Sequence, residues 1–279
     1  WGRSEGNQPL TNGPGSPNSR RPLAQYTHAP VNAFDPWNTS HYEGVSTTVK
    51  KRFSDGLQFA SSFTYGKAMD LFDQSIDLCD GCNEGIQNSY NLNSLMAPAD
   101  DDVRFRYTFA GTWSLPAGRG RRFVSHGWGA DVLGSWQVDA IFTAQTGFPF
   151  TPILSFDNAN AGTTSWPNRV CNGSLPNPTL SEWFDTACFV TPPQYQFGNS
   201  GRNILTGPGM DNLDFGLHRS FTVPVGETTR LEFRAEAFNM LNHPQFSQPG
   251  STIGNPGVGI ISSTSTANRE IQLALRLAF

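Results

Sequence analysis

The 279-residue sequence lacks any apolar run close to the roughly 18 residues that a membrane-spanning helix needs. It also has little charge, since Asp, Glu, Lys and Arg make up 15% of the chain and leave a net charge of −4. The first absence excludes a helical membrane protein. The second gives no electrostatic reason to expect nucleic acid as a partner. Neither absence argues against a membrane barrel, because barrel strands alternate apolar and polar residues.

Familiar catalytic and metal-binding patterns are missing too. The 5 histidines do not show the close spacing of zinc enzymes, and no G-x-S-x-G stretch marks a nucleophilic serine. The sequence therefore predicts no enzyme, no metal site and no cofactor.

The 4 cysteines fall into two pairs. Cys79 and Cys82 form a lone C-x-x-C, without the second pair of a zinc site or the strand–helix context of a redox motif. Cys171 and Cys188 share one long connection, where a bridge would close a loop of about eighteen residues. We predict a disulfide in each pair, with metal binding as the alternative.

Acidic residues gather near the first cysteine pair and offer oxygen atoms that would suit calcium. They are Asp77, Asp80, Glu84, Asp100, Asp101 and Asp102. Their spacing matches no EF-hand, so a solvated loop edge is the favoured interpretation.

What the sequence does contain is alternation with a period of two. It is clearest where Arg230, Glu232, Arg234 and Glu236 alternate with apolar residues. A helix would spread these charges over a broad arc, whereas a strand places all of them on one face. We predict that the four form a structural network facing a water-filled lumen. Contact with substrate is the alternative.

The same alternation predicts about seven long strands. They cover residues 44–53, 57–65, 103–115, 136–145, 213–221, 230–237 and 270–279. An Asp-Gly pair at 55–56 predicts a tight hairpin between the first two.

The connections between these strands alternate between short and long. The short ones are 54–56, 116–134 and 223–227, and the long ones are 71–101, 151–210 and 241–268. Outer-membrane barrels have this asymmetry, with short periplasmic turns and long external loops. The fold predicted is therefore all-β, a fragment of an antiparallel transmembrane β-barrel with long extracellular loops. Arg119, Arg121 and Arg122 fall in a short connection, where a solvated turn is the default and lipid headgroups or a partner are alternatives.

A few charges interrupt the apolar faces near strand ends, from which long side chains can reach the membrane interface. They are Lys51, Lys67, Arg219 and Arg269. Seven strands cannot close a barrel of the usual even number, and open edges in lipid are costly. We therefore expect residues 44–279 to be the C-terminal part of a larger barrel, and residues 1–43 to be an extracellular loop or partial segment.

Several stretches resemble one family in the same order along the chain. They are residues 38–44, 51–57, 63–70, 197–209 and 233–246, followed by the final Phe279. Together they resemble the C-terminal barrel portion of TonB-dependent outer-membrane receptors, in the Oar-like group that carries a carboxypeptidase-regulatory-like domain. The resemblance implies a barrel of about 22 strands with a plugged lumen. The TonB box and the plug are not in these residues, and Phe279 resembles the signal that barrel-assembly machinery reads.

The resemblance implies TonB-dependent uptake of a large or scarce ligand across the outer membrane. The implied partners are outer-membrane lipid, the missing N-terminal barrel and plug, the TonB system and the barrel-assembly machinery. Loop residues that could contact the ligand are Trp166, Trp183, Tyr195, Asn199, Arg202 and Asn203. The alternatives are a passive porin or adhesin-like barrel, and a secreted all-β glycan-binding module.

Overall fold

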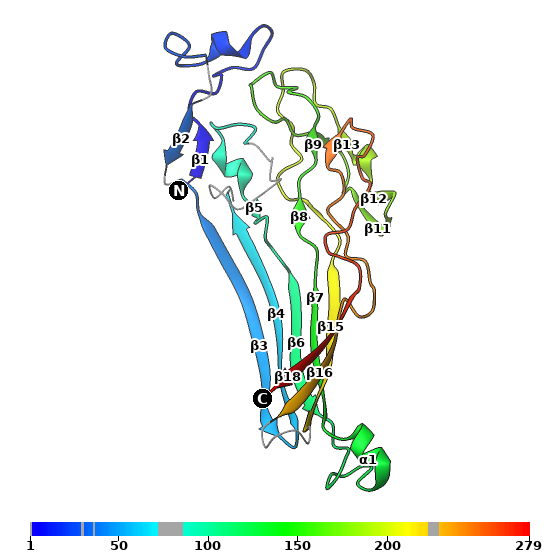
Figure 1. Ribbon diagram of the computed structural model, residues 1–279. Helices are drawn as coiled ribbons and strands as arrows, with labels where there is room; N and C mark the ends of the chain where they lie inside the picture. Colours follow the sequence, from blue (N-terminus) through cyan, green and yellow to red (C-terminus); the bar gives the residue numbers. More distant parts are fainter. Residues whose placement is uncertain (1, 29–30, 36, 72–85, 223–228) are drawn as a thin grey trace.

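The computed structural model describes residues 2–28, 31–35, 37–71, 86–222 and 229–279. Its main feature is one antiparallel sheet in the order β18-β16-β15-β7-β6-β4-β3, with the short β5 paired to β4. The long strands are β3 (Ser40–Ser54), β4 (Leu57–Asp70), β6 (Phe105–Ser114), β7 (Trp136–Gln145), β15 (Met210–Thr222), β16 (Arg230–Phe238) and β18 (Glu270–Ala278). The seven predicted strands are thus confirmed, and each pairs with its neighbour in sequence (Figure 1).

The hairpin between β3 and β4 turns at Asp55 and Gly56, which have φ angles of 53° and 79°. Asp-Gly suits two consecutive left-handed positions, so the predicted tight turn is confirmed. The pairing of β3 with β4 continues away from this turn as far as Ser40, which lies opposite Asp70. The prediction that this strand begins at residue 44 was therefore wrong, because His41 and Glu43 interrupt the polar–apolar pattern without interrupting the backbone pairing.

The pairing register sorts the side chains into two chemically different faces. One face, here called the polar face, carries Thr48, Ser62, Thr112, Asp139 and His218, among others. The other, the apolar face, carries in β18 alone Ile271, Leu273, Leu275 and Leu277, with exposed fractions of 54–71%. A whole sheet face with this composition would be unfavourable in contact with water.

Aromatic rings on the apolar face pack across neighbouring strands. Phe59 stacks on Phe109 with ring centroids 5.9 Å apart, and Tyr65 lies 5.0 Å from Phe105. At the end of the sheet that carries the short connections, Trp136 meets Phe233 edge-on at 6.0 Å. Such pairs stabilise neighbouring strands by about 0.5–1.5 kcal/mol beyond the area they bury.

The long and short connections lie at opposite ends of the sheet (Figure 1). The connection between β6 and β7 was expected to be a turn, but it contains the helix α1 (Gly127–Leu133). Seven residues are too few for sequence periodicity to identify a helix. Within the described ranges, no helix is long and apolar enough to span a membrane.

The long connections fold into a layer that we call the loop cap, formed by the described parts of residues 6–28, 86–104, 146–209 and 239–269. Its short strands are β5 (Ala97–Pro98), β8 (Pro149–Phe150), β9 (Ile153–Leu154), β10 (Asn168–Arg169), β11 (Ser174–Thr179), β12 (Glu182–Phe184), β13 (Phe189–Val190), β14 (Leu205–Thr206) and β17 (Thr252–Ile253). Beside them lie β1 (Gly2–Glu5), β2 (Asn32–Asp35) and the 3-10 turns η1 (Pro17–Arg20), η2 (Leu92–Leu95) and η3 (Thr186–Cys188).

The buried apolar clusters of the molecule's described part lie in the loop cap and where it meets the end of β4. One cluster joins Leu71, Ile86, Leu95 and Trp166, and a second joins Phe150, Phe184, Cys188, Phe189 and Leu205. Loops without a core would not hold a fixed shape, whereas these loops are packed like a small domain.

The contrast between the two faces can be tested with neighbouring residues of β18. Leu273→Arg places a charge midway along β18 on the apolar face, whereas Gln272→Arg places it opposite Glu236 on the polar face. We expect Leu273→Arg to cost about 2–4 kcal/mol of folding free energy in vesicles, and Gln272→Arg to cost little. Urea titration of the intact protein in vesicles measures both. Equal losses would contradict the assignment of the faces.

Candidate functional site

The polar face carries a hydrogen-bonded cluster that spans three strands. Thr112 on β6 donates its hydroxyl to Asp139 Oδ1 on β7 at 2.7 Å. His218 Nδ1 on β15 lies 2.9 Å from Asp139 Oδ2. Gly216 is the residue directly opposite Asp139, so it leaves the carboxylate accessible to His218 one pleat further along. Asp139 is therefore the polar centre of the sheet's middle strands.

Hydroxyl groups continue the polar face toward β3. The Thr48 and Ser62 hydroxyl oxygens are 2.5 Å apart, and Thr64 donates to Ser46 at 3.1 Å. These cross-strand pairs satisfy polar side chains without charge, which is the chemistry expected of a face in contact with water or with another polar surface.

The four charged residues of β16 share this face with Asp139. Glu232 lies opposite Arg276 of β18 and Ser220 of β15, while Arg234 lies opposite His218. Among the described residues no ion pair joins Arg230, Glu232, Arg234 or Glu236 to a partner, and Glu232 Oε2 is buried without a hydrogen bond. Their role as a lumen network remains a prediction.

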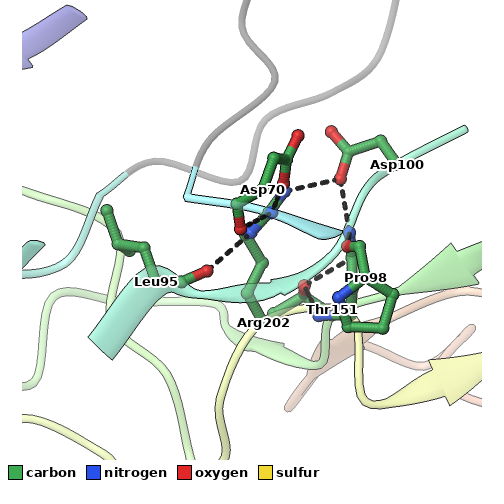
Figure 2. A network of polar contacts seen from close by, with 7 residues as sticks. Asp70, Leu95, Pro98, Asp100, Thr151 and Arg202 are labelled. Carbon is green, nitrogen blue, oxygen red and sulfur yellow. Dashed lines mark hydrogen bonds and ion pairs between the residues drawn. The ribbon is translucent and has the colours of Figure 1, made fainter. Parts of the chain in front are cut away.

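Arg202 organises the loop cap where it meets the top of the sheet (Figure 2). Its guanidinium forms an ion pair with Asp70 at the end of β4, and a second with Asp100 at 2.9 Å. It also donates to the carbonyl oxygens of Leu95 at 3.3 Å and Asp70 at 3.1 Å. Only 1% of the Arg202 side chain is exposed, and all three guanidinium nitrogens donate to protein oxygens.

Asn203 extends the Arg202 network to Thr151, the residue that follows β8. Its side-chain amide donates to Pro98 O at 2.8 Å and to Asp100, and its backbone N–H donates to Thr151 Oγ1 at 2.8 Å. Asn203 has a φ of 53°, a left-handed conformation that asparagine tolerates well. The 200–204 segment is thereby fastened to the connection between β4 and β6 and to the beginning of its own connection.

Buried glutamines join the beginning of the chain to the same layer. Gln8 Nε2 donates to Gln87 O at 2.8 Å, and Gln87 Nε2 donates to Gly198 O at 2.8 Å. Gly198 passes so close to Trp166 that an added Cβ would lie 2.0 Å from the tryptophan carbonyl oxygen. Residues near the beginning of the chain are therefore part of the loop cap, which their composition did not indicate.

The six residues expected to contact a ligand occupy different environments. Trp166, Arg202 and Asn203 are buried, and their side chains belong to the internal packing and bonding just described. Trp183 is half-buried and donates its indole N–H to Thr206 O at 2.9 Å. Tyr195 is half-buried, while Asn199 is exposed, with its side chain accepting the Arg169 N–H at 2.9 Å. The last three remain accessible.

Cys171 and Cys188 are joined by a disulfide across 17 residues, beside the second apolar cluster. Among the described residues, the one group close enough to hold a metal consists of these cysteines and Asp185. Since the two sulfurs are bonded to each other, they are not thiolate ligands. Cys79 and Cys82 lie outside the described residues, as do Asp77, Asp80 and Glu84.

The remaining acidic residues considered for calcium include two that bind protein groups. Asp100 accepts from Arg202 and Asn203. Asp102 accepts the Ala68 N–H at 2.6 Å and lies 3.1 Å from Arg104. The role of these two carboxylates in the structure is to anchor the loop between β5 and β6. Phe279, the proposed assembly signal, follows β18 and is 96% exposed.

Comparison with known proteins gives one match. A family model described as an outer membrane beta barrel domain matches residues 1–272. No curated protein and no solved structure matches the chain.

The Arg202 network can be tested by removing its cation. Arg202→Met leaves Asp70 and Asp100 without their ion pair, and breaking a buried pair costs about 3–5 kcal/mol. We expect a loss of this size in the opening free energy of residues 95–102 and 198–206, measured by amide hydrogen exchange of the intact protein. The triple variant with Asp70→Asn and Asp100→Asn is the matched control, and it should recover part of the protection. Unchanged protection in Arg202→Met would contradict this role.

The disulfide should stabilise the segment that it closes. Reducing a disulfide that closes a loop of this length lowers the free energy of unfolding by about 3 kcal/mol, if the effect is the loop-closure entropy of the unfolded chain. We expect protease cleavage between residues 171 and 188 to accelerate when reductant is added to the wild-type protein, and to be insensitive to reductant in the Cys171→Ser/Cys188→Ser variant. If reductant leaves wild-type cleavage unchanged, the apolar cluster alone holds this segment.

Proposed function

Since the chain belongs to the family of outer membrane beta barrel domains and is an outer membrane protein, we propose that it works in TonB-dependent uptake. It supplies the C-terminal strands and external loops of an Oar-like receptor for a large or scarce ligand. It carries no catalytic chemistry and needs no cofactor.

The observation that carries this proposal is the loop cap. A passive pore gains nothing from a packed and cross-linked layer over one end of its strands, whereas a receptor gains a preorganised binding surface. The buried Arg202 network and the Cys171–Cys188 bridge supply that rigidity. In this proposal Trp166, Arg202 and Asn203 shape the layer from inside, and Trp183, Tyr195 and Asn199 contact the ligand.

The free edges of the sheet support a larger barrel. Within the described ranges, β3 and β18 each pair on one side only. Unpaired backbone groups in lipid cost several kcal/mol each, so each edge requires a further strand. We assign those strands and the plug to other parts of the same protein, with TonB acting through the plug. Phe279 is then the residue through which the barrel-assembly machinery recognises the strand it inserts.

The second candidate is a passive porin or adhesin-like barrel, which shares the apolar face and the loop asymmetry. A secreted glycan-binding module is less compatible with the family, because its apolar face would be exposed to water.

Conductance separates the two membrane functions without knowledge of the ligand. The intact protein in a planar bilayer should show no steady open channel, because a plug fills the lumen. It should also bind the purified periplasmic domain of TonB in detergent. A stable open-channel current together with no TonB binding would establish the porin and overturn the receptor.

Orientation is testable with a short epitope inserted at either end of the sheet. Gly257 in the loop cap and Gly120 beside α1 both have open space around them. We expect antibody to label an insertion at Gly257 on intact cells, and an insertion at Gly120 only after the outer membrane is permeabilised. The reverse result would invert the proposed orientation, and labelling at both sites on intact cells would contradict it.

A further inference from the structure

The connection between β6 and β7, residues 115–135, is a compact folded segment. Leu115 N donates to Trp136 O at 2.8 Å, and Phe123 N donates to Pro116 O at 2.9 Å. Gly118 and Gly134 pass so close that a Cβ on Gly118 would lie 2.5 Å from the Gly134 Cα. This segment therefore holds a fixed shape, although it lies beyond the ends of the strands (Figure 1).

A bidentate ion pair fastens α1 to the preceding turn. Arg119 Nε lies 2.6 Å from Asp131 Oδ1, and Arg119 Nη2 donates to Asp131 Oδ2 at 2.7 Å. The hydrogen bond from Arg119 is the largest cause that lowers the pKa of the Asp131 carboxyl, so the pair stays ionised at neutral pH. The one acidic charge of the segment is thus already neutralised.

The end of α1 is attached to the apolar side of the sheet. Arg219 lies opposite Trp136 and Phe233, on the apolar face. Its guanidinium donates to the carbonyl oxygens of Asp131 and Val132 and stacks 5.6 Å from the Trp136 ring centroid. Trp136 donates its indole N–H to Val132 O at 2.9 Å. These contacts place α1 beside the surface that faces lipid.

The segment exposes apolar side chains that the protein itself does not cover. Their exposed fractions are 81% for Trp128, 54% for Phe123, 52% for Val132, 50% for Leu133 and 45% for Val124. Trp128 and Val132 are four residues apart and so share one side of α1. Val132 joins this group to the apolar face, because its carbonyl oxygen accepts hydrogen bonds from Trp136 and Arg219.

The same segment carries unneutralised positive charge. It has three arginines and one aspartate, and Asp131 is paired with Arg119. Arg121 and Arg122 are exposed, and the Arg122 guanidinium lies 5.5 Å from the Phe123 ring centroid. Exposed arginine beside exposed aromatic and aliphatic residues is the composition of elements that lie in the interface of a membrane.

We propose that residues 115–135 form a membrane-interface anchor that binds anionic phospholipid. Trp128, Phe123 and Val132 enter the boundary between headgroups and acyl chains, while Arg121 and Arg122 bind headgroup phosphates. Arg219 sets how deep the anchor lies in the membrane, because it bonds the end of α1 to the apolar face near the end of β15. This proposal rests on the outer membrane location and not on TonB-dependent uptake.

Lipid is the occupant favoured over a protein partner by the position of the segment. The exposed apolar group adjoins a face that contacts acyl chains in an outer membrane barrel, and the two arginines supply the charge complementary to phosphate. A protein partner would have to cover both the segment and the neighbouring lipid-facing strand ends.

Tryptophan quenching by brominated lipid tests the anchor in the intact protein. The protein is reconstituted in phosphatidylcholine vesicles that contain either brominated phosphatidylcholine or brominated phosphatidylglycerol. The difference between wild type and Trp128→Phe isolates the emission of Trp128, and Trp183→Phe in the loop cap is the matched control. Circular dichroism confirms that each variant retains its strands.

We expect both lipids to quench the Trp128 signal, with a preference for the anionic lipid of up to about thirty-fold for two arginines near its surface. Arg121→Gln/Arg122→Gln should bring that preference close to one while quenching persists, and the Trp183 signal should respond to neither lipid. A Trp128 signal that neither lipid quenches would overturn the anchor. Equal quenching by the two lipids in the wild type would overturn the recognition of anionic headgroups.

Discussion

The structure depends on a single register of strand pairing, because that register decides which side chains share a face. Hydrogen bonds between neighbouring strands satisfy the backbone from β3 to β18, except at the two outer edges. A slip of one residue in the pairing of β7 would move Asp139 to the apolar face, and a slip in the pairing of β16 would do the same to Glu232; either would leave a charge in lipid. The cross-strand aromatic pairs on one face and the hydroxyl pairs on the other both favour the observed register.

The loop cap solves a different problem, which is to give long connections a fixed shape. Its polar groups are bonded over long separations in sequence, as when Arg202 meets Asp70 across 132 residues and Asp100 across 102. These bonds matter because the groups are buried. A charge or amide that lost its partner would have neither a hydrogen bond nor water, which costs free energy. The layer is thus assembled from several connections at once, and it presents one surface above the strands.

The strands and their faces could be predicted from the sequence because the alternation of polar and apolar residues is a local property, visible within about ten consecutive residues of a strand. The hairpin at Asp55-Gly56 was predictable for the same reason. The loop cap was not, because its contacts join residues more than a hundred positions apart: Arg202 was read as a ligand contact, and nothing near it in sequence indicates Asp70 or Asp100. The helix α1 was missed because seven residues carry too little periodicity. Gln8 and Gln87 were missed because glutamine in a loop usually faces water.

The most direct test of this account measures which face of β16 meets lipid. Single nitroxide labels at positions 231 to 237 of the intact protein in vesicles, with Cys79 and Cys82 replaced by serine, report collision rates with oxygen and with a water-soluble nickel complex. We expect the two collision rates to oscillate with a period of two residues and with opposite phase. The rate with oxygen should be highest at 231, 233, 235 and 237, and the rate with nickel at 232, 234 and 236. Low collision rates with both reagents at the odd positions would mean that this face is covered by protein, and would contradict a lipid-facing sheet.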